Sequence, residues 1–73
     1  MKKIKRLLEN IEALMTLHHW ERYSLVISNQ KIGLKLTPKK DGDSEMNWII
    51  DKNKEGINDL NFQIEEMINN GEY

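Results

Sequence analysis

The stretch LHHWER, residues 17–22, holds the side chains best suited to chemistry in this sequence. Adjacent histidines beside a glutamate suggest a metal site or a proton relay, because imidazole and carboxylate groups serve in both. On a regular helix, however, His18 and His19 point about 100° apart, so they do not ligate one ion together. His18 and Glu21 share a face, but no third histidine or cysteine completes a site. We therefore expect no metal and interpret the imidazoles as complements to a helix C-terminus.

Residue types for catalysis or cofactor binding are otherwise sparse. The sequence has no cysteine, no glycine-rich phosphate loop and no carboxylate pair in a recognisable setting. A turn explains the dipeptide Asp41-Gly42, and the segment GDSE at residues 42–45 lacks the elbow that exposes a nucleophilic serine. We predict that the protein is not an enzyme and holds no cofactor.

The charge of the chain is divided between its two halves. Residues 1–40 carry nine Lys or Arg against three Asp or Glu, whereas residues 41–73 carry two against nine, so the net charge of -1 combines +6 with -7. The start of the chain is basic, but acidic and amide residues interrupt the apolar run that a secretory signal needs. No other stretch approaches the roughly 20 apolar residues of a membrane span. We expect a soluble, cytoplasmic protein that makes no membrane contact.

Two segments show the period of an amphipathic helix. The first apolar stripe contains Ile4, Leu7, Leu8, Ile11, Leu14 and Met15. The second contains Ile57, Leu60, Ile64, Met67 and Ile68. Asp51 or Asn53 suits the N-cap of the second helix, and Gly71 is placed to end it. We interpret Trp20, which follows the first helix, as a hydrophobe packed over the edge of a sheet, and the alternative is an exposed anchor for a partner.

Between these helices, residues 22–37 alternate in polarity as a β-hairpin does. We predict a two-residue turn at Asn29-Gln30, with Asn29 in the left-handed backbone conformation, and a three-residue loop Lys40-Asp41-Gly42, with the glycine in that conformation. With these two connections, every inward-facing position of the strands is apolar. A two-residue second loop would instead set Leu36 against Asn47. The resulting rows on the inner face are Tyr23/Leu36/Met46, Leu25/Leu34/Trp48 and Ile27/Ile32/Ile50.

Together these elements predict one small α+β domain over residues 1–73. Its order is α-β-β-β-α, a three-stranded antiparallel meander with two helices packed on one face and the other face in water. So short a chain buries only about 60% of the surface that its unfolded form exposes, and we expect modest stability.

The α-β-β-β-α order resembles the double-stranded RNA-binding domain over nearly the whole chain. That family places a lysine-rich cluster at the start of its last helix to meet phosphates. The matching segment here, DKNKEGINDL, offsets Lys52 and Lys54 with Asp51, Glu55 and Asp59, and the glycine-rich central loop is missing. Nucleic acid is therefore the less favoured partner. Its binding surface would be the basic end of the first helix with Arg22, Lys31, Lys35, Lys39 and Lys40.

The same build, two helices on a small meander with an acidic half, is similar to small phage inhibitor proteins, anti-CRISPR proteins among them. Such proteins often bind the basic groove of a host enzyme through clustered carboxylates. This resemblance of size, composition and charge pattern implies an inhibitor or adaptor whose partner is a protein with a basic surface.

The outer side of the second helix carries residues that folding does not need. Phe62 lies about 140° from Ile57 on an ideal helix and faces away from the buried stripe. Carboxylates surround Phe62. Carboxylates steer a basic partner toward a surface, and an aromatic ring then anchors that partner. The predicted partner-binding residues are Phe62, Asp59, Glu66, Glu65 and Glu55. The alternative is that rotation of the helix or a contact between two copies buries Phe62.

A secondary interface is predicted on the open face of the sheet. Val26, Gly33 and Ile49 form one apolar row across the three strands, flanked by lysines such as Lys35. The row is either a set of ordinary exposed residues or a contact surface, and a homodimer is one use of it.

Overall fold

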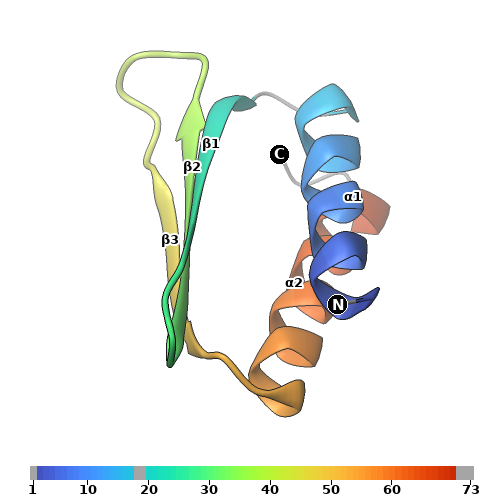
Figure 1. Cartoon of the computed structure of the whole chain (residues 1–73). Helices are drawn as coiled ribbons and strands as arrows, with labels where there is room; N and C mark the ends of the chain where they lie inside the picture. The colour runs from blue at the N-terminus through green and yellow to red at the C-terminus, as the bar shows by residue number, and fades with distance from the viewer. Residues whose placement is uncertain (1, 18–19, 71–73) are drawn as a thin grey trace.

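The computed structural model describes residues 2–17 and 20–70, and it confirms the predicted α+β fold. The elements in chain order are α1 (Lys2–Leu17), β1 (Trp20–Ile27), β2 (Lys31–Pro38), β3 (Met46–Asp51) and α2 (Lys54–Asn70). The strands form one antiparallel sheet in the order β1-β2-β3, and both helices lie on the same side of it (Figure 1). The predictions for His18, His19 and Gly71 fall outside the described residues.

Both predicted strand registers are confirmed, and the three apolar rows run across the sheet. Leu34 of the central strand, for example, faces Leu25 of β1 on one side and Trp48 of β3 on the other. Within these rows the residues of β2 are buried, whereas those of the edge strands are half-buried, apart from Ile27 at the end of β1, which is 43% exposed. This gradient arises because an edge strand has a neighbouring strand on one side only.

The first turn has the predicted length but not the predicted conformation. No non-glycine residue in the described part of the chain has a positive φ, so the left-handed Asn29 is wrong. The Ser28 N–H donates to the Lys31 carbonyl at 2.9 Å, and the Lys31 N–H donates to the Ser28 hydroxyl at 3.0 Å. A serine side chain thus takes a position that a backbone carbonyl usually fills, which the alternation pattern does not reveal.

The second loop is longer than predicted. Residues 39–45 connect the strands, because β2 ends at Pro38 and β3 begins at Met46. Within this loop the Asp43 N–H donates to the Lys40 carbonyl at 3.2 Å, and Gly42 has a φ of 98°, as expected for the glycine. The register is nevertheless as predicted, because the apolar rows determine it independently of the loop.

The core lies between the sheet and the two helices. Both predicted stripes supply it, with Leu7, Ile11 and Leu14 from α1 and with Ile57, Leu60, Ile64 and Met67 from α2. Trp20 begins β1 and belongs to this core, with only 4% of its surface exposed. At the edge of the core, the Trp48 indole N–H donates to Gln63 Oε1 at 2.9 Å and links β3 to α2.

α2 begins with a side-chain cap. Asn53 Oδ1 accepts a hydrogen bond from the Gly56 N–H at 2.8 Å, so Asn53 rather than Asp51 is the N-cap. Gly56 is in close contact with the preceding chain, since a Cβ atom there would lie 2.3 Å from the Asp51 carbonyl oxygen. This tight junction sets where α2 leaves the sheet, and it positions the outward side of the helix.

Candidate protein-binding surface

Four residues form a continuous stripe along the outward side of α2, and we call them the outer stripe. They are Glu55, Asp59, Phe62 and Glu66. Their spacing of four, three and four positions keeps them within about 60° of one another around the helix axis. All four are exposed, whereas Leu60 and Ile64 on the opposite side are fully buried. Phe62 is 61% exposed, so the predicted orientation of this ring away from the core is confirmed.

The three carboxylates of the outer stripe take no part in the ion pairs of the described residues. The ion pairs formed within the described residues use other acids, namely Glu65, Glu21, Asp51 and Glu45. Glu55, Asp59 and Glu66 therefore surround Phe62 with negative charge that no described basic side chain neutralises by direct contact. These carboxylates attract a basic surface and repel phosphate groups, and the exposed ring lies among them.

Glu65, the remaining predicted binding residue, is held by α1. Its Oε2 accepts hydrogen bonds from Asn10 Nδ2 at 3.0 Å and from Arg6 Nη2 at 2.6 Å. These hydrogen bonds, with that from Asn10 as the larger effect, lower the pKa of the Glu65 carboxyl below its ordinary value. The Glu65 side chain remains 31% exposed. We therefore place it at the margin of the surface rather than in its centre.

A seam of polar side chains joins the two helices beneath this margin. Asn61 is only 3% exposed, and its Oδ1 accepts a hydrogen bond from Asn10 Nδ2 at 3.0 Å. Its Nδ2 donates to the Lys3 carbonyl at 3.4 Å, and Lys3 Nζ donates to Asn58 Oδ1 at 2.8 Å. Apolar periodicity in the sequence does not reveal this seam, because it assigns every amide to the solvent side. The one available signal was the position of Asn61 beside the buried arc.

A shallow groove of about 460 Å³ runs between the outer stripe and α1. Its lining consists of Arg6, Asn58, Asp59, Asn61, Phe62 and Glu65. One wall is therefore the phenyl ring, and the other is the polar seam with the guanidinium of Arg6. The groove provides a recess beside Phe62 in which a partner side chain can pack against the ring.

The predicted secondary interface on the sheet is exposed as well. Val26, Gly33 and Ile49 face one another across the three strands. Val26 is 63% exposed and Ile49 is 79% exposed, and no described element covers this face of the sheet (Figure 1). Lys35 Nζ pairs with Glu45 Oε2 at 3.2 Å. The lysine beside the row is thus partly neutralised within the chain.

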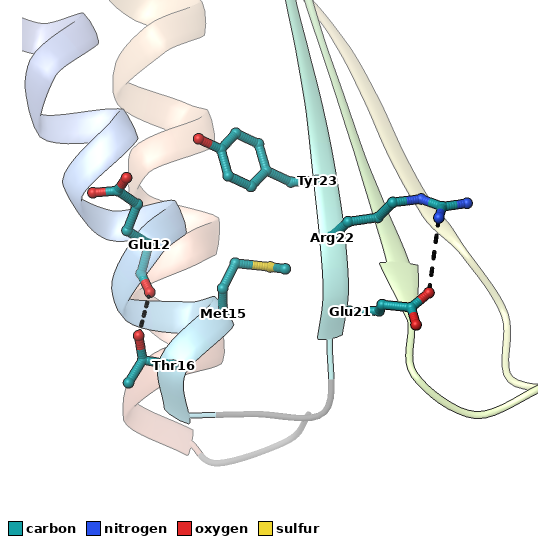
Figure 2. A pocket seen from close by; sticks show the side chains of 6 residues that line it. All are labelled: Glu12, Met15, Thr16, Glu21, Arg22 and Tyr23. Carbon is teal, nitrogen blue, oxygen red and sulfur yellow. Dashed lines mark hydrogen bonds and ion pairs between the residues drawn. The ribbon is translucent and has the colours of Figure 1, made fainter.

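A cleft of about 610 Å³ opens between the C-terminal half of α1 and the start of β1. Figure 2 shows the Tyr23 ring and the Met15 side chain lying in the space between the helix and the strand. Arg22 extends to the other side of β1, where its Nη1 lies 3.9 Å from Glu21 Oε2 (Figure 2). The Thr16 hydroxyl donates to a backbone carbonyl of α1 at 3.0 Å. The helix-facing part of this cleft is therefore chiefly a surface for apolar contact.

Residues 2–17 and 20–70 hold no group of three or more His, Cys, Asp or Glu side chains arranged to bind a metal ion. None of the helices that they form has both the length and the apolar character required to cross a membrane. Since both histidines lie outside these residues, the absence of a metal stays a prediction.

Comparison of the chain with models of protein families gave no match, and neither did searches of curated proteins and of solved structures. The likenesses to double-stranded RNA-binding domains and to phage inhibitors thus remain likenesses of element order and charge pattern. Fold and surface define a small α+β protein with an exposed aromatic-acidic helix face, and function is inferred from that face.

Proposed function

We propose that this protein is a non-catalytic binding module that docks the outer stripe of α2 on a basic surface of another protein, and so acts as an inhibitor or an adaptor. The exposure of Phe62 is the single observation that carries this proposal. The ring is 61% exposed on a helix whose opposite side lies in the core. Folding of the chain alone gains little from a phenylalanine at this position, whereas a partner that covers the ring gains its burial.

The two kinds of side chain in the outer stripe have complementary roles in such an interface. Burial of an aromatic side chain contributes about 1.5–3 kcal/mol, which is typical of the anchoring residue of an interface. The surrounding carboxylates accelerate association with a basic surface and disfavour acidic competitors. An inhibitor of the anti-CRISPR kind, which covers a nucleic-acid groove of its target, has these same requirements.

Nucleic acid is the alternative partner, and it would bind the basic end of α1 together with Arg22, Lys31, Lys35, Lys39 and Lys40. The ion pairs of the sheet weaken this alternative, because Lys31 already pairs with Asp51 and Lys35 with Glu45. A phosphate backbone would have to displace these carboxylates before it used the lysines. A salt-dependent electrophoretic shift of a labelled RNA duplex at modest protein concentration would favour this alternative over the protein partner.

Comparative affinity capture tests the proposed function. The baits are the wild-type chain, Phe62→Ala and Leu17→Ala, the last being a matched control because Leu17 is 62% exposed on the other helix. We expect a partner with a basic surface that the wild type and Leu17→Ala retain and Phe62→Ala loses, while all three baits give the same circular dichroism spectrum. Equal retention by the three baits, or unfolding of Phe62→Ala, would contradict the proposal.

A further inference from the structure

We infer that the partner adds an extended basic segment to the sheet of this protein, paired with the free edge of β3 beside the start of the outer stripe. This inference rests on the proposed function and specifies the conformation and the charge of the segment that is recognised. Three features of the molecule carry it: the direction of the backbone groups of β3, the lack of protection of this edge, and the charge of the groove next to it.

The backbone groups of alternate residues in β3 point away from the sheet. The Lys52 N–H donates to the Gln30 carbonyl at 2.8 Å, and this pair continues the register between β2 and β3. Hydrogen-bonded and non-hydrogen-bonded positions alternate along an antiparallel pair. The even-numbered residues of β3 therefore bond to β2, and the N–H groups of Asn47, Ile49 and Asp51 point to the free edge.

The two edges of the sheet are protected to different degrees. β1 has a register shift between Trp20 and Arg22, an irregularity of the kind that blunts an edge strand. β3, with the sequence MNWIID, pairs with β2 in unbroken register and contains no proline, glycine or lysine. Its Ile49 side chain is 79% exposed. An edge of this kind is a template for an added strand.

The groove beside this edge favours a basic occupant. It measures about 360 Å³ and is lined by residues of β3 and of the first turns of α2, among them Asp51, Glu55 and Asp59. Lys31 is the one basic residue among the described residues that line it, and its Nζ already pairs with Asp51. Glu55 and Asp59, which also belong to the outer stripe, are therefore left to pair with a Lys or Arg of the added segment.

A second copy of the chain is a less suitable occupant of the same edge. Two β3 strands can pair in antiparallel fashion about Ile49, with the outward N–H and C=O groups of one strand bonded to those of the other. Hydrogen bonding alone therefore does not exclude a dimer. Such a dimer, however, brings together two acidic halves, since residues 41–73 carry two basic and nine acidic side chains, a charge of -7. Like charges at this distance oppose the association. Charge complementarity therefore selects a basic segment from another protein.

The test titrates a short capped peptide of alternating lysine and valine into the ¹⁵N-labelled full chain and follows the backbone amides by NMR. A peptide with glutamate in place of lysine is the charge control. We expect saturable shifts of the Asn47, Ile49 and Asp51 amides with the lysine peptide, and binding of the glutamate peptide that is weaker by about tenfold or more. Equal affinities, or no saturable shift of these amides, overturn the inference. Concentration-dependent shifts of the same amides without peptide identify a second copy as the occupant and overturn it as well.

Variants at one position separate strand addition from general attraction. Ile49→Pro removes the N–H that points to the free edge and leaves the hydrogen bonds to β2 in place, whereas Ile49→Thr keeps this N–H. We expect Ile49→Pro to weaken binding of the lysine peptide by about tenfold and Ile49→Thr to bind within about threefold of the wild type. Equal binding by the two variants overturns the inference.

Charge reversal is a second test that does not depend on the stability of Ile49→Pro. The double variant Glu55→Lys, Asp59→Lys should prefer the glutamate peptide over the lysine peptide, and an unchanged preference for lysine overturns the inference.

Failure of strand addition is distinguishable from failure of the proposed function. A partner lost by Phe62→Ala but retained by Ile49→Pro would leave the outer stripe as the binding surface and remove strand addition, whereas a partner retained by both variants would remove both.

Discussion

Truncation of Leu34 to alanine is the most direct test of the core. Leu34 lies on the central strand between Leu25 and Trp48, and 2% of its surface is exposed. The substitution removes three carbon atoms, worth about 0.8 kcal/mol each in transfer free energy. The residual cavity adds to this loss, so we expect a decrease of about 2.5–5 kcal/mol in the free energy of unfolding.

This loss is large relative to the stability of so short a chain. At about 0.05–0.15 kcal/mol per residue, 73 residues give a free energy of unfolding of roughly 4–11 kcal/mol. Leu34→Ala should therefore lower the urea midpoint strongly. If the stability of the wild type lies at the lower end of this range, the variant should be substantially unfolded without denaturant.

Two further leucine truncations serve as graded controls for this measurement. Leu25 faces Leu34 across the sheet and is half-buried, whereas Leu17 at the end of α1 is 62% exposed. Urea unfolding followed by circular dichroism should rank the losses Leu34→Ala, then Leu25→Ala, then Leu17→Ala, with the last below about 0.5 kcal/mol. Equal losses at Leu34 and Leu17 would refute the assignment of the inner face of the sheet.

Three further predictions concern the start of α2 and its contact with α1. Asn53→Ala removes the N-cap and should lower the free energy of unfolding by about 1 kcal/mol in urea titrations. Gly56→Ala should also destabilise the fold, because the alanine Cβ would lie 2.3 Å from the Asp51 carbonyl oxygen. This clash outweighs the helix propensity of alanine, which exceeds that of glycine by about 1 kcal/mol. A raised melting temperature would contradict this prediction. Because hydrogen bonds from Asn10 and Arg6 lower its pKa in the folded chain, Glu65 stabilises the fold above its ordinary pKa, and this contribution is lost as the pH falls through the lowered value. Glu65→Gln should therefore show a shallower acid-induced loss of the free energy of unfolding than the wild type, and identical pH profiles would count against the contact.

The strands and helices were predictable because their side-chain periods differ and each has one apolar side. Only one register makes all three rows of the inner face apolar, and a slip by one residue would have turned Leu34 to the solvent. The same argument on α2 separates Phe62 from the buried arc and places its ring on the surface. Both results follow from local spacing, which a single sequence contains in full.

Features that depend on polar partners far apart in the chain were not predictable in this way. Asn61 is buried because Asn10 and the Lys3 carbonyl bond to it from α1, more than fifty positions away. Glu65 has the same spacing to Phe62 as other surface acids, yet Arg6 and Asn10 draw it toward α1. The Ser28 side chain in the first turn is a local contact, but one of several that its sequence allows.

The central claim is that Phe62 anchors a partner and does not support the fold. Its most direct test is calorimetric titration of the partner found by affinity capture with the wild type, Phe62→Ala and the control Leu17→Ala. We predict that Phe62→Ala weakens binding by about 2 kcal/mol or more, roughly 30-fold in Kd, while its free energy of unfolding stays within about 0.5 kcal/mol of the wild type and Leu17→Ala binds normally. Unchanged affinity of Phe62→Ala, or a loss of folding that accounts for its weaker binding, would contradict the claim.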